Sequence, residues 1–201
     1  VKATPTLDMF NTQYPNYYVI KDDSIDISKN AKYSEVTKLG DLKIVDASFA
    51  VEQYAIAVKK GNKALLDSIN KTIMTIKIDG TYENLINAFM PVDGNIVIPE
   101  IADVDSKEVV KMGTNAAFPP FEYIKGSEEV GFDVSMSKLI AKDLNKKLQV
   151  VDMSFDGLIA AVQSGAVDFV AAGMTATDER RQNVDFSEPY YESNQVIIVR
   201  K

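Results

Sequence analysis

In the second half of the chain, short apolar runs alternate with longer stretches in which apolar residues recur every three or four positions. The stretches predict two helices, with Asp133 and Asp156 as their N-caps and Gly165 closing the second helix. The apolar runs predict three strands, at residues 109–112, 149–153 and 167–171. Along the chain the elements therefore follow the order strand, helix, strand, helix, strand, which is typical of α/β proteins.

This order predicts a doubly wound, mainly parallel sheet, in which crossover helices bring the carboxyl ends of successive strands to one edge. Ligands of such sheets bind at that edge. The loops that follow the three predicted strands meet there, and they are residues 115–121, 154–155 and 172–177. The strand order alone therefore predicts a binding site where these loops converge.

The remaining apolar patterns predict further strands. Apolar runs predict strands at 54–58 and 195–199. Ile96-Val97-Ile98, which lies between polar turns, is a candidate edge strand.

Residues 1–48 are less informative. Residues 27–39 are a candidate helix, whereas residues 1–26 show no recognisable pattern. We interpret the tyrosines near Pro15 as local packing rather than a binding platform.

Composition limits the chemistry that these elements can carry. The 201 residues are 46% hydrophobic and 25% charged, which is typical of a folded globular chain. A net charge of −7 and a pI near 4.7 disfavour binding to nucleic acid, whose phosphates would be repelled. The chain has neither Cys nor His, which excludes disulfides, thiol nucleophiles, imidazole bases and the usual zinc ligands, and no cofactor is expected. Because it shows no signal peptide and no apolar run of about 18 residues, we expect the chain as given to be soluble.

Three segments supply the groups that a zwitterionic α-amino acid requires. Such a ligand needs aromatic walls for its side chain, acceptors for its ammonium group, and backbone N–H groups with a guanidinium for its carboxylate. Residues 113–123 supply phenylalanines and prolines, 153–157 a phenylalanine, and 172–181 glycine, threonines and arginines. These segments contain the converging loops, so one amino-acid site is predicted there.

The same segments resemble the extracytoplasmic solute-binding proteins of ABC importers for polar amino acids, which are periplasmic binding proteins of type II. The resemblance covers roughly residues 49–201. In that family, the segment like 113–123 lies near the mature N-terminus and the segment like 54–62 lies near the C-terminus, whereas here their order is reversed. The chain therefore resembles a circular permutant, or a truncated piece cut across two modules.

The resemblance implies a large amino-acid-binding lobe over residues 49–201. In this interpretation residues 49–90 and 108–201 form the lobe and 91–107 are the linker between them. The resemblance also implies helices over 63–78 and 82–89 that pack on this lobe. Residues 1–48 would be a partial or remodelled segment of the small lobe, in which residues 42–46 resemble the family's last small-lobe strand. The family's Gly-Thr-Thr-Gly-like turn and its acidic residue for the ligand ammonium have no counterpart in this chain.

The resemblance also implies a role for individual loop residues. The guanidinium of Arg180 would bind the ligand carboxylate together with the hydroxyl and N–H of Thr175, and the carbonyl of Gly173 would accept from the ammonium group. Two phenylalanines would enclose the ligand side chain. The implied ligand-binding residues are Asn115, Phe118, Phe155, Gly173, Met174, Thr175 and Arg180.

Asn115 stands where many members of the family carry Asp. The change removes a negative charge, which weakens the case for a cationic ligand and leaves glutamine, asparagine or another polar amino acid comparably open. Glu122 would either restore an acidic contact or pair with a lysine at the rim.

Each of these residues also has a structural interpretation. Phe118 would belong to a rigid loop that covers the core, and Phe155 would be a core residue. Arg180 would pair with Asp178 or Glu179 at the surface, in a helical turn capped by Thr177. Its neighbour Arg181 is expected to face solvent.

Three functions follow as hypotheses. The first is a periplasmic or extracellular protein, lipid-anchored in its precursor, that binds a free polar amino acid and delivers it to the membrane permease of an ABC importer. The second is a permuted scaffold or sensor with weak or no binding. The third is an enzyme like the cyclohexadienyl dehydratases, which would need a buried Glu as general acid; because no such residue can be assigned, we expect no enzyme. If the small lobe is incomplete, a domain-swapped homodimer would cover the exposed apolar faces.

Overall fold

The centre of the molecule is a five-stranded sheet in the order β10-β3-β9-β4-β8. The structure is a computed structural model, which describes residues 18–22, 42–91 and 94–200. Strand β4 runs parallel to β8 and β9, and β3 runs antiparallel to β9 and β10, so within this sheet β3 alone opposes the other strands. The predicted α/β class with a mainly parallel sheet is confirmed. The strands are β3 (Ala57–Lys59), β4 (Val109–Thr114), β8 (Lys147–Asp152), β9 (Phe169–Val170) and β10 (Val184–Phe186).

The predicted strand-helix alternation is confirmed in the second half of the chain. Helix α5 (Phe132–Asp143) connects β4 to β8, and helix α6 (Leu158–Ser164) connects β8 to β9. Strand β9 is shorter than predicted. Its predicted start is interrupted at Asp168, which is exposed and whose carboxylate accepts a hydrogen bond from the Lys111 N–H at 2.7 Å.

The predicted N-caps of both helices are wrong. Helix α5 begins after Gly131, whose φ is +138° and where an added Cβ would lie 2.1 Å from the Phe121 carbonyl oxygen, so only glycine fits. Asp133 lies inside the first turn and is fully buried. Asp156 lies in the short 3-10 turn η1 (Phe155–Gly157), and α6 begins after that turn. The prediction that Gly165 closes α6 in the left-handed conformation is confirmed.

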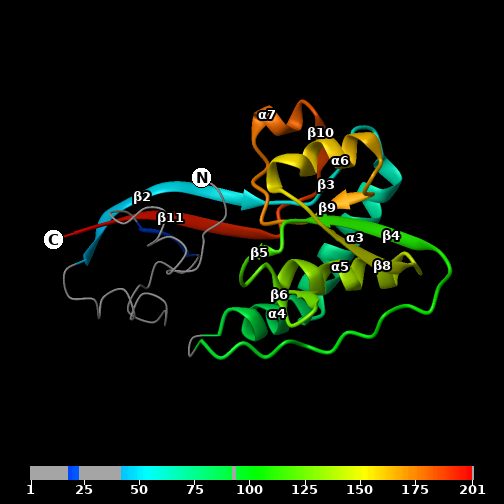
Figure 1. Ribbon diagram of the computed structural model, residues 1–201, viewed down its shortest axis with the longest axis horizontal. Helices are drawn as coiled ribbons and strands as arrows, with labels where there is room; N and C mark the ends of the chain where they lie inside the picture. The colour runs from blue at the N-terminus through cyan, green and yellow to red at the C-terminus, as the bar shows by residue number, and fades with distance from the viewer. Residues whose placement is uncertain (1–17, 23–41, 92–93, 201) are drawn as a thin grey trace.

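Helices cover both faces of the sheet (Figure 1). Helices α3 (Lys63–Ile78) and α4 (Thr81–Phe89) match their predictions and share one apolar cluster with α5 and one face of the sheet. Helix α6 packs in a second cluster on the other face. The first cluster includes Val58, Ile69, Ile73, Leu85, Met112, Ile140 and Phe169, and the second includes Ala57, Leu158, Val162, Val170 and Val184.

Residues 54–58 do not form the single strand that their apolar run predicts. Strand β2 (Leu42–Tyr54) ends at Tyr54, and the chain bends before β3. At the bend, the Ala55 N–H donates to the Met174 carbonyl at 3.0 Å and the Ile56 N–H to the Ser187 hydroxyl at 2.9 Å. These partners come from two different segments, which is why the strand does not continue straight.

Strand β2 pairs antiparallel with β11 (Tyr191–Arg200), which in turn pairs with β1 (Tyr18–Asp22). This ribbon extends away from the central sheet in Figure 1. The strands predicted at 42–46 and 195–199 lie within β2 and β11. The helix predicted at 27–39 falls outside the described residues.

Two connecting segments differ from the sequence pattern. A small antiparallel sheet of β5 (Ala117–Phe118), β6 (Glu122–Lys125) and β7 (Glu128–Val130) lies between β4 and α5 and was not predicted. Ile96-Val97-Ile98 is not an edge strand, because its Val97 N–H donates to the Ala88 carbonyl of α4 at 3.1 Å instead of to a sheet.

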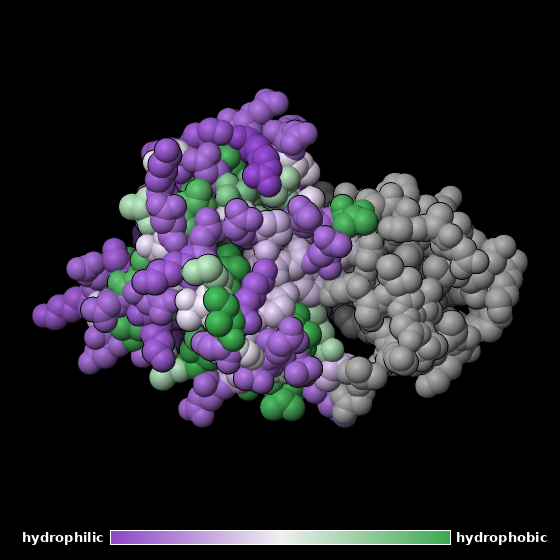
Figure 2. Space-filling view, turned by 180° about the vertical axis from the view of Figure 1, so that it is seen from behind, coloured by the Kyte–Doolittle hydropathy of each residue, from purple (hydrophilic) through white to green (hydrophobic). Residues whose placement is uncertain are grey.

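The surface is mainly hydrophilic, with apolar residues in small separate patches on the face that Figure 2 shows. None of the helices in the described ranges is both long and apolar enough to cross a membrane.

Candidate ligand-binding site

Hydrogen bonds join the three predicted loops at the carboxyl ends of the parallel strands. The Asn115 side-chain amide donates to the Met153 carbonyl at 2.9 Å, which ties the first loop to the second. The Thr114 hydroxyl donates to the Ala171 carbonyl at 2.8 Å, which ties the end of β4 to the residue directly before the third loop. Asp152 also accepts from the N–H of Ala116 at 2.8 Å. The loops that strand order alone brought together therefore do meet at one edge of the sheet.

The third loop is fixed by the end of β2. Tyr54 and Thr175 form an isolated antiparallel bridge, and the Met174 carbonyl accepts from the Ala55 N–H on one side of it. On the other side, the Ala176 N–H donates to the Gln53 carbonyl at 3.1 Å. Met174 is fully buried, so its side chain packs in the core. The end of β2 thus holds the loop that carries Gly173, Met174 and Thr175.

Arg180 lies on the short helix α7 (Asp178–Arg181), which Thr177 caps as predicted by accepting from the Arg180 N–H at 3.3 Å. One guanidinium nitrogen donates to the Thr175 carbonyl at 2.8 Å, and the guanidinium lies over the Phe155 ring at 5.2 Å from its centroid. The side chain is half-buried. Burial lowers the pKa of Arg180, whereas the Glu52 and Glu179 carboxylates oppose that shift, and the group remains cationic at neutral pH.

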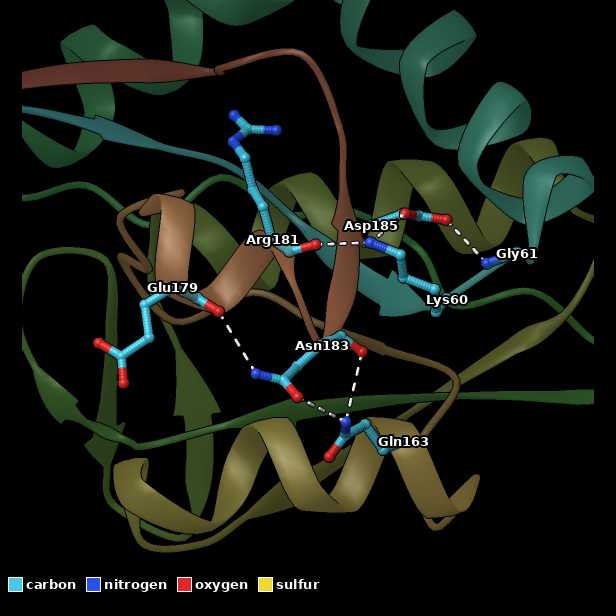
Figure 3. Close-up of polar contacts among 7 residues, drawn as sticks. All are labelled: Lys60, Gly61, Gln163, Glu179, Arg181, Asn183 and Asp185. Carbon is cyan, nitrogen blue, oxygen red and sulfur yellow. Dashed lines mark hydrogen bonds and ion pairs between the residues drawn. The ribbon is translucent and has the colours of Figure 1, made fainter.

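Residues in the turn after β3 contact the C-terminal end of helix α7. The Lys60 ammonium donates to the Arg181 carbonyl at the end of the helix and pairs with the Asp185 carboxylate at 3.5 Å (Figure 3). The same carboxylate accepts from the Gly61 N–H at 2.7 Å. The Arg181 side chain is exposed, as predicted, and points away from these contacts toward the Phe186 ring.

A second set of contacts holds α7 from the side of α6. The Asn183 amide donates to the Glu179 carbonyl at 3.3 Å, and the Gln163 amide of α6 donates to the Asn183 carbonyl at 3.3 Å (Figure 3). The position of Arg180 therefore depends on groups from two other elements, none of which the sequence pattern singled out.

The two phenylalanines predicted as walls have different surroundings. Phe118 is only 3% exposed, and its ring stacks on Phe121 at 5.3 Å and meets Tyr54 edge-on at 6.4 Å. Gly173 lies against the same ring, because a Cβ added there would be 2.5 Å from Phe118 Cε1. Phe155 is partly exposed and contacts Arg180. Phe118 thus forms the floor of the loop cluster, and Phe155 lies at its surface.

Sequence reasoning missed a buried polar cluster under Gly173. Asp133 Oδ2 accepts from the Gly173 N–H at 2.8 Å and from the Tyr190 hydroxyl at 2.7 Å. Burial raises the pKa of Asp133 to about 6. Glu122 is 1% exposed and hydrogen-bonds to Asp133, so the expectation that it pairs with a lysine at the rim is wrong. The sequence did contain a signal for this cluster, because Asp133 is an acidic residue among the apolar residues of a predicted helix.

No group of three or more metal-ligating acidic side chains occurs in the described part of the chain. The predicted site residues present a guanidinium, backbone amides and carbonyls, a hydroxyl and aromatic rings.

The model of the bacterial extracellular solute-binding proteins, family 3, matches residues 110–201. This match covers a little under half of the chain. The arginine-binding extracellular protein ArtP of Bacillus subtilis is 46% identical over 95 residues, which are 47% of this chain and 37% of that protein. A probable histidine-binding protein of Campylobacter jejuni is 42% identical over 92 residues, which are 46% of this chain and 36% of that protein. The chain thus spans a little over a third of the length of both curated relatives.

Among solved structures, the arginine-bound form of domain 1 from TmArgBP is 38% identical. The match covers 51% of this chain and 87% of that chain, with a TM-score of 0.42. The resemblance to solute-binding proteins that the motifs indicated is confirmed for the matched part of the chain.

Proposed function

We propose that the chain is part of a solute-binding protein that binds a polar α-amino acid for delivery to an ABC importer. The observation that carries the proposal is the half-buried guanidinium of Arg180 at the carboxyl edge of the parallel sheet. One of its N–H groups bonds Thr175, and a guanidinium has five, so others are available for a bidentate bond to a carboxylate. The names of the relatives, arginine-binding and histidine-binding, support an amino acid as the ligand.

In this proposal the loops divide the work of recognition. Arg180 and the hydroxyl and N–H of Thr175 bind the carboxylate, and the carbonyl of Gly173 accepts from the ammonium group. Phe155 packs on the ligand side chain and Phe118 forms the floor. Met174 positions the loop through its buried side chain.

Asn115 determines which side chains are accepted. Its amide nitrogen already donates to the Met153 carbonyl, so its oxygen is the group left for a ligand. An amide oxygen accepts from a guanidinium, an imidazole or another amide, but repels a carboxylate. We therefore expect arginine, histidine and glutamine to bind and glutamate to bind weakly.

The same proposal extends to domains, partners and compartment. Residues 49–201 would be the large lobe with 91–107 as its linker, and 1–48 would contribute to a small lobe. The partners would be a free amino acid and a membrane permease, and the protein would lie in the periplasm or outside the cell, lipid-anchored in its precursor. A domain-swapped dimer would provide the missing lobe from a second copy, and light scattering that finds a monomer at high concentration would speak against it.

The experiment is titration calorimetry of the unmutated chain with arginine, histidine, glutamine and glutamate. Saturable binding of one or more of the first three, with weaker binding of glutamate, supports the proposal. If no amino acid binds, the second candidate holds, a scaffold without binding. That candidate is favoured by one observation, the 3% exposure of Phe118, which leaves little of its ring for a ligand.

A further inference from the structure

The turn at Gly173 rests on a buried carboxylate. The Gly173 N–H and the Tyr190 hydroxyl both donate to Asp133 Oδ2, at 2.8 and 2.7 Å. Asp133 is 0% exposed and Tyr190 1%, so neither group can exchange these bonds for bonds to water. A buried carboxylate that binds a loop amide fixes the backbone of that loop.

Glu122 makes this carboxylate one half of a pair. It is almost fully buried, and its side chain hydrogen-bonds to Asp133. Two buried carboxyl groups in hydrogen-bond contact cannot both be ionised, because like charges repel and burial disfavours charge. The pair therefore holds a proton and carries one negative charge, for which the Gly173 N–H and Tyr190 hydroxyl are donors.

The opposite side of Gly173 is also closed. Its φ is +49°, and a Cβ added to it would lie 2.5 Å from the ring of Phe118. The turn is thus confined between an aromatic ring and the carboxyl pair. Two residues further on, the Thr175 carbonyl accepts from the Arg180 guanidinium. A shift of the turn would carry Thr175 with it and change the orientation of Arg180.

We propose that Asp133, together with Glu122, is a positioning residue for amino-acid binding that acts through the Gly173 N–H on the loop of residues 173–175. The inference rests on the proposed function for its effect on affinity. Its effect on the loop itself does not depend on any ligand. Removing the carboxylate leaves a buried N–H without an acceptor, and such a group is expected to draw the loop out of place.

The groups that face Asp133 define how it responds to pH. They are Glu122 from β6, Tyr190 from the segment after β10, and Tyr54 from the end of β2. Burial raises the pKa of both tyrosines, which therefore stay neutral. In this set Asp133, whose pKa burial raises to about 6, is the group that titrates near neutral pH. Below pH 6 its carboxylate gains a proton, and its bond to the Gly173 N–H loses its charge assistance.

The test has two arms, measured on the same variants. In the ligand-free chain, NMR follows the amide of Gly173, its chemical shift from pH 5 to 8 and its hydrogen exchange. Calorimetry then measures affinity for arginine, histidine and glutamine. In the unmutated chain we expect a protected Gly173 amide whose shift titrates with Asp133. In Asp133→Asn, which keeps an acceptor oxygen but no charge, the titration should disappear and the dissociation constant should rise a few-fold, by roughly 3-fold to 10-fold.

Asp133→Ala should speed exchange at Gly173 and raise the dissociation constant more than tenfold. If that variant does not fold, Asp133→Asn decides the question. The matched control is Ser137→Ala, one turn further along α5, which removes a buried hydroxyl that has no hydrogen-bond partner and should leave both measurements unchanged.

The outcomes are distinguishable. A Gly173 amide that neither titrates in the unmutated chain nor changes in either variant overturns the inference, whatever the affinities are. Equal losses of affinity in the Asp133 variants and in Ser137→Ala also overturn it, because the effect would then be general to α5. If the unmutated chain binds none of the amino acids, the proposed function fails, and the inferred role in ligand binding fails with it; the NMR arm still decides whether Asp133 fixes the loop.

Discussion

Arg180 lies with its guanidinium 5.2 Å from the centroid of the Phe155 ring while it donates to the carbonyl of Thr175. The cation is therefore oriented by a ring on one side and a backbone carbonyl on the other before any ligand is present. Pre-orientation of this kind limits the entropy lost on binding.

The first prediction separates Arg180 from its neighbour. Arg180→Ala should remove most amino-acid binding, at a cost of about 2–5 kcal/mol, because a charge-assisted bidentate pair is lost from a partly desolvated site. Arg181→Ala is the control, since that side chain is exposed and should barely change affinity. Calorimetry on both folded variants checks this, and equal losses would place the carboxylate elsewhere.

Phe155→Ala should weaken binding by roughly 1–3 kcal/mol without abolishing it. The ring packs on the guanidinium, so its removal frees Arg180 to sample other orientations while its charge remains. Calorimetric titration with arginine and glutamine measures the effect. A variant that binds as tightly as the unmutated chain would mean that the ring is not a wall of the site.

Lys60→Met should weaken binding modestly, by about twofold to fivefold, because it removes two contacts that hold the end of α7. The matched control is Lys59→Met, which changes an exposed lysine of the neighbouring position in β3. Affinity is measured at low and at high salt. The loss of affinity in Lys60→Met should be smaller at high salt, because salt screens exposed charges. Identical behaviour of the two variants would show that α7 does not need this support.

Gly173→Ala should destabilise the fold by about 2–4 kcal/mol, since the added methyl group meets the Phe118 ring in a backbone conformation that also disfavours alanine. Gly126→Ala isolates the backbone contribution. Its φ is +68°, but nothing lies within 4 Å of the added carbon, so its cost should be about 1 kcal/mol. Urea unfolding of both variants gives the difference, and equal costs would show that Phe118 yields freely.

The raised pKa of Asp133 makes a prediction about stability. A carboxyl group whose pKa rises on folding stabilises the native state fully below its unfolded pKa, near 4, and that contribution is lost as the pH rises through about 6. Relative to Asp133→Asn, the unmutated chain should therefore lose about 2–3 kcal/mol of unfolding free energy between pH 4 and pH 7. Parallel curves for the two proteins in urea unfolding would contradict the assignment.

The sequence pattern predicted those structural features that depend only on residues close together in the chain. The strand at Val109, the left-handed end of α6 at Gly165 and the cap at Thr177 each depend on a few neighbouring residues, and each has its counterpart in the structure. The convergence of three loops also followed, because strand order determines which ends meet.

Features that depend on distant partners were out of reach. Asp133 has the spacing of a cap, but its carboxylate bonds to residues forty and more positions away, at Gly173 and Tyr190. The bend after Tyr54 arises because Ala55 and Ile56 bond to segments far along the chain. That the predicted site residues bind an amino acid stays a prediction.

The position of β3 has a consequence for biosynthesis. Ala57 pairs with Val170 on one side and with Phe186 on the other, so its neighbours are synthesised long after it. On the ribosome, β3 would therefore have no neighbouring strand until β9 emerges. Such late-closing, long-range pairings slow folding and expose aggregation-prone surface. Expression yield should therefore respond to slower translation and to chaperone supply more strongly than for a lobe whose central strands are made together.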